Sequence, residues 1–250
     1  MNLGDLFTQT LNAMGKDQYG GYVSPGTGVS NSFPDALNEV IQPDLMNAFT
    51  NKFEESRILS NDVRPFIKTL GDTNNAALPL VPWSAAASFS YGQFPSDFWY
   101  FSDAYSADFV SSCSAVTSVQ YRSVEWVDRA RWNYLVSQKL QFPTRKLPIA
   151  SIQNDQIAVC PALTKMTFTY LRKPLDIVFD YEILSGNTVF YLPPGTFHTN
   201  ATTAPIGTPS TSVELEWPES VHNEILTRLI QWFGRTIQSQ LDMSMPSKKP

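Results

Sequence analysis

Few residues in this 250-residue chain have the types and spacing that could do chemistry. The best acid–base candidates are Glu214 and Glu216, because alternate residues of a strand point to one side. Two carboxylates on one face are what glycoside hydrolysis can require. The alternative is an exposed strand face beside the N-terminus of the next helix, where carboxylates interact favourably with the helix dipole. We expect the second, structural role.

The chain contains few of the histidine and cysteine residues that catalysis or metal binding would use. His198 and His222 are the only histidines, and Cys113 and Cys160 are the only cysteines. A metal site or a histidine-assisted nucleophile would need the fold to bring carboxylates or a cysteine beside one of these rings. The sequence also lacks the GxSxG, GxxxxGK[ST], GxGxxG, HExxH and CxxC motifs. We therefore expect no enzyme, no cofactor and no metal, and buried free cysteines rather than a disulfide.

The composition narrows the class of protein. The formal charge of -5, from 18 Lys and Arg against 23 Asp and Glu, argues against a protein whose main role is to grip nucleic-acid phosphates. No apolar run approaches the roughly 18 residues of a membrane span, and the first residues do not resemble a signal peptide. We expect folding in a cytoplasm and no membrane partner. Aromatic residues make up 13% of the chain, which favours large contact surfaces with protein or sugar.

Helical periodicity is strongest at the two ends of the chain. The first residues predict a short amphipathic helix closed by Gly15, and 35–41 and 44–57 predict two consecutive helices with Pro43 in the first turn of the second. A long helix over 218–241 starts at Pro218. Its apolar stripe is Val221, Ile225, Leu229, Phe233, Ile237 and Leu241, and that of the first helix is Leu3, Leu6, Phe7, Leu11 and Met14.

A middle helix over 128–140 has Asp128 as its candidate N-cap. Its possible buried face is Trp132, Leu135, Val136 and Leu140. The long terminal helix needs a partner of similar length, and the N-terminal and middle helices are the candidates. We expect the helices from the start, middle and end of the chain to form one layer.

Short β segments fill the chain between these helices. Strands are expected from residue 76 onward, with 95–101 leading into a short ordered or helical stretch. In 165–174, Met166, Phe168 and Tyr170 alternate with polar neighbours, which is typical of a half-buried strand. The further predicted strands are 115–127, 155–161, 178–184, 187–194 and 212–217.

The pattern as a whole predicts an α+β fold. A helical bundle from the N-terminal, middle and C-terminal helices would carry an inserted antiparallel β-domain. The expected parts are an N-terminal helical part (1–75), a first β-rich part (76–127), a middle helix joining the bundle (128–141), a second β-rich part (142–217), a C-terminal bundle helix (218–241) and a tail (242–250).

Several phrases of the sequence, taken in order, resemble a known family. They are "LGDLFTQTLN", "NDVRPFIKTLG", "FPSDFWYF", "VEWVDRARWNYLVSQKLQFPTRKLPIA", "IAVCPALTKMTFTYLRKPLDIVFDYEI" and "LEWPESVHNEILTRLIQWFG". Together they resemble virion structural proteins of crAss-like bacteriophages, and most closely the ring proteins of the tail and head-to-tail connector. The likeness covers most of the chain and includes no catalytic signature. "GTGVSNSFPDA" and Pro43 depart from it, because they interrupt what the family leads us to expect as more continuous helix.

The resemblance implies a connector- or adaptor-like fold and a homo-oligomeric ring, with a homododecamer as the expected stoichiometry. The implied partners are a portal and other tail, ring or connector proteins, and DNA and cargo protein would pass through an axial channel without sequence-specific binding. The protein would be found in the virion after assembly in the host bacterial cytoplasm.

The interface candidates are the loops 19–28 and 193–209 and the tail after Leu241, which are long and poor in charge. The candidate residues are Tyr19, Tyr22, Pro25, Trp99, Phe197, His198, Met243, Pro246 and Lys248. An alternative function is a carbohydrate-binding or depolymerising β-sandwich module of a phage tail, suggested by the Trp and Tyr content and by Glu214 and Glu216. A further possibility is contact with nucleic acid in the channel, which would weaken steeply with salt.

Overall fold

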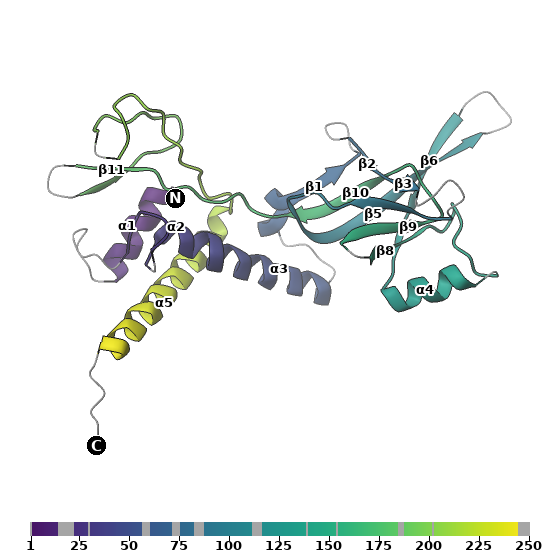
Figure 1. The fold of residues 1–250 in the computed structure, drawn as a ribbon, viewed down its shortest axis with the longest axis horizontal. Coiled ribbons are helices and arrows are strands. Elements are labelled where there is room, and N and C mark those ends of the chain that lie inside the picture. Colours follow the sequence, from purple (N-terminus) through teal and green to yellow (C-terminus); the bar gives the residue numbers. More distant parts are fainter. Residues whose placement is uncertain are drawn as a thin grey trace, which may run out of the picture. The chain divides into compact units, whose positions relative to one another are not determined.

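A computed structural model describes residues 2–14, 23–29, 31–56, 61–71, 76–82, 88–111, 117–138, 140–153, 155–184, 188–201 and 203–244. Side chains are described over the same residues except 53–56, 107–111, 117–121 and 237–244. The chain divides into two compact units (Figure 1). Unit 1 comprises Met1–Pro65 and Pro174–Pro250, and unit 2 comprises Phe66–Lys173. The fold is α+β with antiparallel sheets, as predicted.

Helix α1 (Leu3–Ala13) opens unit 1 with a capping box. The side chain of Asn2 accepts a hydrogen bond from the amide of Asp5, and the Asp5 carboxylate accepts one from the amide of Asn2. Leu3, Leu6 and Leu11 are buried, as is Phe7. The predicted helix and its apolar face are confirmed for these residues.

The next helices form one continuous stretch, α2 (Phe33–Asp35), the π-helix η1 (Ala36–Ile41) and α3 (Gln42–Ser56). The prediction of two separate helices is therefore wrong. Pro43 has no amide hydrogen and its ring would crowd the carbonyl four residues earlier in an α-helix. The wider π turn precedes it, with the Gln42 amide bonded to the carbonyl of Leu37, so the chain passes Pro43 without leaving the helix. A 3-10 helix, η2 (Asn61–Phe66), follows.

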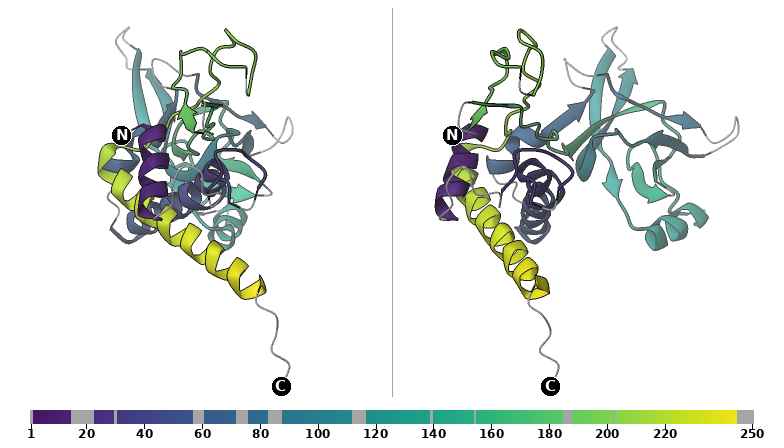
Figure 2. Two further views of the ribbon diagram at one scale, coloured as in Figure 1. Left: turned by 90° about the vertical axis from the view of Figure 1, so that its left-hand side faces the viewer. Right: turned by 60° about the vertical axis from the view of Figure 1, so that its left-hand side comes forward.

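Helix α5 (Glu219–Ser244) contacts both α1 and η1 (Figure 2). Val221, Ile225, Leu229 and Phe233 are buried, which confirms the described part of the predicted stripe. The side chains of Ile237 and Leu241 lie outside the described residues. Burial of each such side chain stabilises the folded state by about 1.5 to 3 kcal/mol, so this stripe is what holds α5 against α1 and η1.

Unit 2 contains two five-stranded sheets. The first has the order β1 (Ile67–Leu70), β10 (Lys165–Arg172), β5 (Phe98–Ser111) and β6 (Thr117–Ser123), with β2 (Leu78–Pro79) also on β10. The second has the order β3 (Val81–Pro82), β4 (Ser90–Gln93), β9 (Gln156–Cys160), β8 (Ile149–Gln153) and β7 (Glu125–Trp126). Every pair is antiparallel except β7 with β8.

The two sheets of unit 2 share one hydrophobic core and form a sandwich. Ala104 and Phe168 from the first sheet cluster with Ala150 and Val159 from the second. On β9 the neighbouring residue Ala158 points to the opposite face, because strand residues alternate. That outer face is covered by helix α4 (Arg129–Ser137).

The prediction that the middle helix joins the terminal helices is wrong. The N-cap Asp128 is confirmed, since its carboxylate accepts a hydrogen bond from the Arg131 amide at 2.7 Å. Yet the one buried residue of α4, Trp132, packs on Ala158 and Cys160 of β9. Leu140, expected on the same face, is 98% exposed beyond the end of the helix. An apolar stripe shows which face is buried but not what covers it.

Three further expectations are corrected. Residues 98–111 form the long strand β5 rather than a helical stretch, because β10 and β6 pair with it on both edges. Residues 212–217 form a single bridge, Val178 with Val213, rather than a strand. The predicted second β-rich part, 142–217, is divided between the units at Lys173.

The division of 142–217 has a packing cause. Strand β10 pairs with β1 and β5 in unit 2. The following segment instead places Phe179 against Phe7 and Phe33, with ring centroids 5.0 and 5.4 Å apart. The short hairpin of β11 (Tyr181–Ile183) and β12 (Val189–Tyr191) therefore belongs to unit 1.

Candidate interaction site

The β11–β12 hairpin and the segment 192–213 form a lobe of unit 1 that has little regular structure, which we call the loop lobe (178–213). The amide of His198 donates to the carbonyl of Thr208, and the amide of Gly207 donates to the carbonyl of His198. The Ser210 hydroxyl donates to the carbonyl of Leu192 at 2.9 Å. In the segment 192–213, the backbone is therefore held mainly by hydrogen bonds and not by a large apolar core.

Two carboxylates and one imidazole lie at the centre of the loop lobe. The Nε2 atom of His198 is 3.1 Å from Oδ2 of Asp180, and its Nδ1 atom is 3.6 Å from Oε1 of Glu182. His198 is 2% exposed and Glu182 is 1% exposed. Only the Nε2 contact with Asp180 is within hydrogen-bond distance, and the buried Nδ1 atom has no hydrogen-bond partner among the described residues.

The carboxylate of Glu182 also fixes the backbone that follows His198. It accepts hydrogen bonds from the amide of Thr199, from the Thr199 hydroxyl at 2.9 Å and from the amide of Asn200 at 2.8 Å. The Asn200 amide holds the pKa of Glu182 below its usual value; burial opposes this shift, and Thr199 and His198 add to it. Glu182 is therefore a charged anchor for this turn.

Asp180 binds the other end of the same loop. Its Oδ2 atom accepts from the Thr211 amide at 2.9 Å as well as facing His198. Burial alone would raise the pKa of Asp180, but the Thr211 amide and the His198 ring together hold it below its usual value. The two carboxylates thus clamp residues 198–211 from both sides.

Sequence reasoning placed His198 at an interface, and this is wrong for its side chain. The ring is buried between Asp180 and Glu182, so it cannot meet a partner directly. Its neighbour Phe197 is 58% exposed, as an interface residue requires. The roles of Asp180 and Glu182 were missed. A signal was present, since two carboxylates at alternate positions of the otherwise apolar "VFDYEIL" point to one buried face.

The remaining predicted interface residues are scattered. Pro25 in unit 1 and Trp99 in unit 2 are half-buried. Met243 lies within α5, but its side chain is outside the described residues, as are Tyr19, Tyr22, Pro246 and Lys248 altogether. Three large apolar side chains of the loop lobe are instead well exposed, with Phe190, Phe197 and Ile206 at 52%, 58% and 69%.

Glu214 and Glu216 act as hydrogen-bond acceptors, in agreement with a structural role. Oε1 of Glu214 accepts from the Tyr191 hydroxyl at 2.7 Å, and Oε2 accepts from the amide of Leu3 at 3.1 Å. Oε2 of Glu216 accepts from the amide of Leu175 at 2.8 Å. The pair therefore does not present two carboxylates on one face of a strand.

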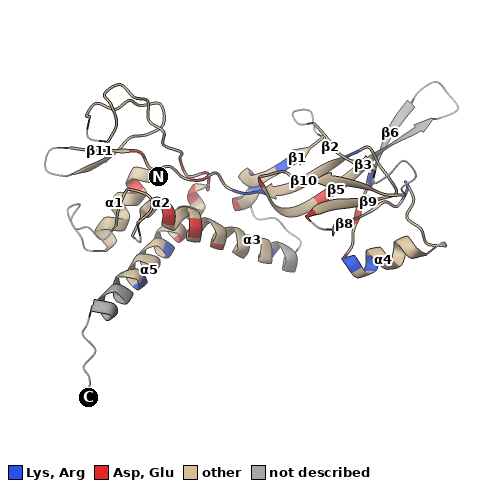
Figure 3. Cartoon of the chain, in the orientation of Figure 1, with Lys and Arg blue, Asp and Glu red and all other residues tan. Residues whose placement is uncertain are grey.

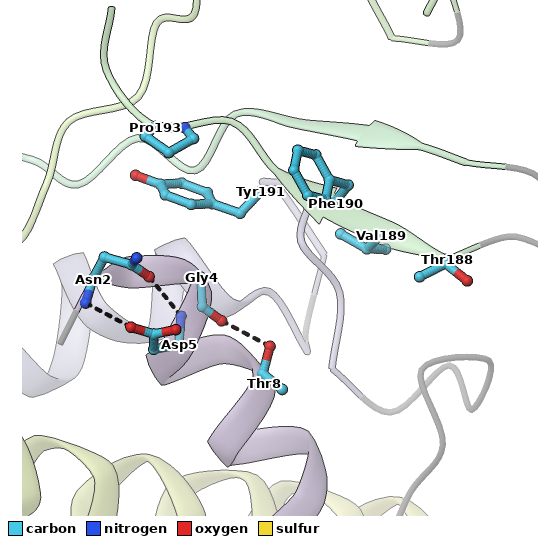
Figure 4. A pocket seen from close by; sticks show the side chains of 9 residues that line it. All are labelled: Asn2, Gly4, Asp5, Thr8, Thr188, Val189, Phe190, Tyr191 and Pro193. Carbon is cyan, nitrogen blue, oxygen red and sulfur yellow. Dashed lines mark hydrogen bonds between the residues drawn. The ribbon is translucent and has the colours of Figure 1, made fainter. Parts of the chain in front are cut away.

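A cavity of about 380 Å³ lies between the first turns of α1 and the β12 strand (Figure 4). Asn2 and Asp5 face it, but both already cap α1, and the Thr8 hydroxyl donates to the carbonyl of Gly4 at 2.8 Å. The polar groups around the cavity are thus used by the helix itself. The cavity therefore provides a concave site with apolar surface from Phe190, but its lining residues do not form a set of convergent catalytic groups.

The chemistry available elsewhere is limited. Cys160 is a buried free thiol, as predicted, and burial raises its pKa to about 11, which makes it a poor nucleophile. Cys113 lies outside the described residues. Across the described residues, no group of three or more His, Cys, Asp or Glu side chains is arranged to hold a metal ion. None of the helices in the described ranges combines the length and apolarity of a membrane span.

No protein-family model matches the chain, and no curated protein matches it.

Proposed function

We propose that this protein is a structural subunit of a homo-oligomeric ring in the tail or head-to-tail connector of a tailed bacteriophage. In this role it forms part of an axial channel through which DNA and cargo protein pass. The proposal combines the family resemblance of the sequence phrases with the surface of the loop lobe.

The observation that carries the proposal is a set of exposed apolar side chains on a backbone held by hydrogen bonds. Phe190, Phe197 and Ile206 are more than half exposed, while the carboxylates of Asp180 and Glu182 hold the surrounding loop. Large exposed apolar groups mark contact surfaces, and a preorganised loop loses less entropy on binding. In an assembling subunit, these exposed side chains would be buried against a neighbouring subunit.

The terminal helices add support. Helix α1 and helix α5 come from opposite ends of the sequence and contact each other, with the β-rich unit 2 inserted between them in the chain. This arrangement supports the proposal, because the resemblance leads us to expect N- and C-terminal helices that pack together and carry an inserted β-domain.

Single-particle electron microscopy of the purified protein tests the proposal. We expect closed rings, with a dodecamer as the expected stoichiometry, whose subunits meet through the loop lobe. Particles of single subunits at high protein concentration, which also fail to join rings of neighbouring tail proteins, would contradict it.

A second function, carbohydrate binding, is favoured by one observation. Unit 2 is a β-sandwich, and Trp99 and Tyr100 are half-buried on its strand β5. Stacking of sugar rings on such side chains is possible. A depolymerising activity has less support, because Glu214 is bonded to Tyr191 and Leu3. A glycan array without binding, together with unchanged hydrolysis by Glu214→Gln, would remove this candidate.

A further inference from the structure

The two units carry charges of opposite sign. Unit 1 contains 8 Lys and Arg against 16 Asp and Glu, a net charge of -8, whereas unit 2 contains 10 against 7, a net charge of +3. These counts cover the whole sequence and add up to the net charge of -5. Separation of charge between two compact units is an electrostatic feature that the net value conceals.

The positive charge of unit 2 coincides with its most exposed apolar side chains. Leu140 and Leu147 are 98% and 76% exposed, and Tyr134 on α4 is 56% exposed. Residues 128–147 hold five basic residues and one acidic residue. We define the basic surface as Arg129, Tyr134, Leu140, Arg145, Lys146 and Leu147.

The basic surface has a firm support. Phe142 packs in the same cluster as Trp132, so the loop 140–147 is anchored beside α4. A bridge between Thr144 and Leu147 closes the loop. Two acidic residues lie close to this surface in the sequence. The carboxylate of Glu125 is paired with Arg131 at 2.6 Å, and that of Asp128 accepts from the Arg131 amide at 2.7 Å, so both are already engaged.

Unit 1 has a surface of the opposite sign around the segment 175–178. The carbonyl of Leu175 accepts from the side chain of Gln42 at 3.3 Å, and Ile177 exchanges two hydrogen bonds with the Asn38 side chain at 2.7 and 2.9 Å. These bonds hold the segment along η1 and the start of α3. Leu175 and Val178 are 56% and 39% exposed.

Acidic residues lie on the same elements as these two apolar side chains or next to them in the chain. We define the acidic surface as Glu39, Asp44, Leu175, Asp176, Val178 and Glu216. Glu39, Asp44 and Asp176 are exposed, and Figure 3 shows acidic residues gathered on the helices of unit 1. Arg228 is 2.7 Å from Glu224 and 4.0 Å from Asp44, so its positive charge already faces two carboxylates of unit 1.

We infer that the basic surface of one copy binds the acidic surface of a second copy, head to tail. Each surface combines exposed aliphatic side chains with exposed charges of one sign, and the two signs are opposite. Such complementarity selects and orients a partner. Because the two surfaces differ, the contact is heterologous, and repetition of a heterologous contact whose rotation closes gives a ring. This inference rests on the proposed function and adds these two surfaces to the subunit contact, beside the loop lobe.

Charge reversal tests this contact. One variant carries Arg129→Glu, Arg145→Glu and Lys146→Glu, and the other carries Glu39→Lys and Asp176→Lys. Each variant alone would bring like charges together at every contact, so we expect self-association at least about tenfold weaker than wild type by mass photometry. An equal mixture restores opposite charges at every contact, and native mass spectrometry should show assemblies in which the two variants are present in equal numbers.

Two controls separate the contact from general effects. Lys165→Glu reverses an exposed charge elsewhere in unit 2, on β10, and should assemble as wild type does. Leu140→Ser with Leu147→Ser leaves the charge unchanged and should weaken association through lost apolar contact. Circular dichroism and thermal melting verify that each variant is folded. We expect each variant to fold because every changed residue is exposed.

The outcomes distinguish this inference from the proposed function. If wild type forms rings and both charge-reversed variants form them equally well, or if the folded variants do not assemble when mixed, the head-to-tail contact is overturned and the ring remains. If wild type stays a single subunit at every concentration, both the ring and this contact are overturned.

Discussion

The carboxylate of Glu214 accepts a hydrogen bond from the backbone amide of Leu3, at 3.1 Å and across 211 positions of the sequence. The same carboxylate accepts from the Tyr191 hydroxyl at 2.7 Å. Glu214 thus fastens the first turn of α1 to the β12 strand and to the segment that leads into α5. Glu214 is therefore a polar link between the two chain ends of unit 1, in addition to the apolar packing of α1 and α5.

Removal of this carboxylate should destabilise unit 1. We expect Glu214→Ala to lower the free energy of unfolding by about 1–3 kcal/mol, because it leaves two partly buried donors without their acceptor. Glu216→Ala is the matched control, since that side chain accepts from the Leu175 amide, and it should cost less. Urea denaturation measures both. Equal losses for the two variants would contradict this role of Glu214.

A pair of helical glycines tests the packing of α1 against β12. A β-carbon on Gly4 would lie 2.9 Å from Cβ of Tyr191, whereas one on Gly234 in α5 meets no atom within 4 Å. Alanine favours a helix over glycine by about 1 kcal/mol. Gly234→Ala should therefore raise the melting temperature and Gly4→Ala should lower it. Stabilisation by both would show that Tyr191 does not pack on α1 in this way.

The buried carboxylates predict a stability that is lost in acid. The pKa values of Asp180 and Glu182 lie below their usual 3.8 and 4.5 in the folded protein. A lowered pKa contributes stability that is present above the unfolded value and is lost as the pH falls through the folded value. We expect Glu182→Gln to be less stable than wild type at pH 7, and the difference to shrink below about pH 4.

Denaturation of both proteins across this pH range measures the effect. Asp176→Asn is the control, because it removes an exposed carboxylate from the same unit and should change the stability little at any pH. A difference between wild type and Glu182→Gln that stays constant with pH would refute the anchoring role of the charge.

Neighbouring residues of the loop lobe should separate assembly from stability. Phe197→Ser removes an exposed ring, so we expect weaker self-association and an unchanged melting temperature. His198→Ala leaves Asp180 and Glu182 facing each other without the ring between them, so we expect a lower melting temperature. Mass photometry and thermal melting on both variants check this. A stability loss in Phe197→Ser with normal assembly would count against the lobe as a contact surface.

Local features of the fold were predictable from the sequence. The capping residue Asp128, the buried faces of α1 and α5, and the alternation of Met166, Phe168 and Tyr170 on β10 depend on neighbours within a few positions. Such patterns are set by the geometry of a helix or strand, which repeats along the chain.

Features that depend on distant partners were not predictable in this way. The stripe of α4 indicated burial, but β9, which Trp132 contacts, comes more than twenty residues later. The alternation in 212–217 indicated a strand, but Glu214 and Glu216 bond to the backbone of Leu3 and Leu175 instead of facing water on a sheet. His198 was predicted at an interface because it lies in a long loop that is poor in charge, while the carboxylates that enclose its ring lie 16 and 18 positions before it.

The measurement that tests the ring most directly is mass photometry of the wild-type protein over a wide range of concentrations. A ring predicts a closed species at one fixed multiple of 28.0 kDa that gains population as the concentration rises, with no continuous series of larger species. A single species at 28.0 kDa throughout the range would contradict the ring.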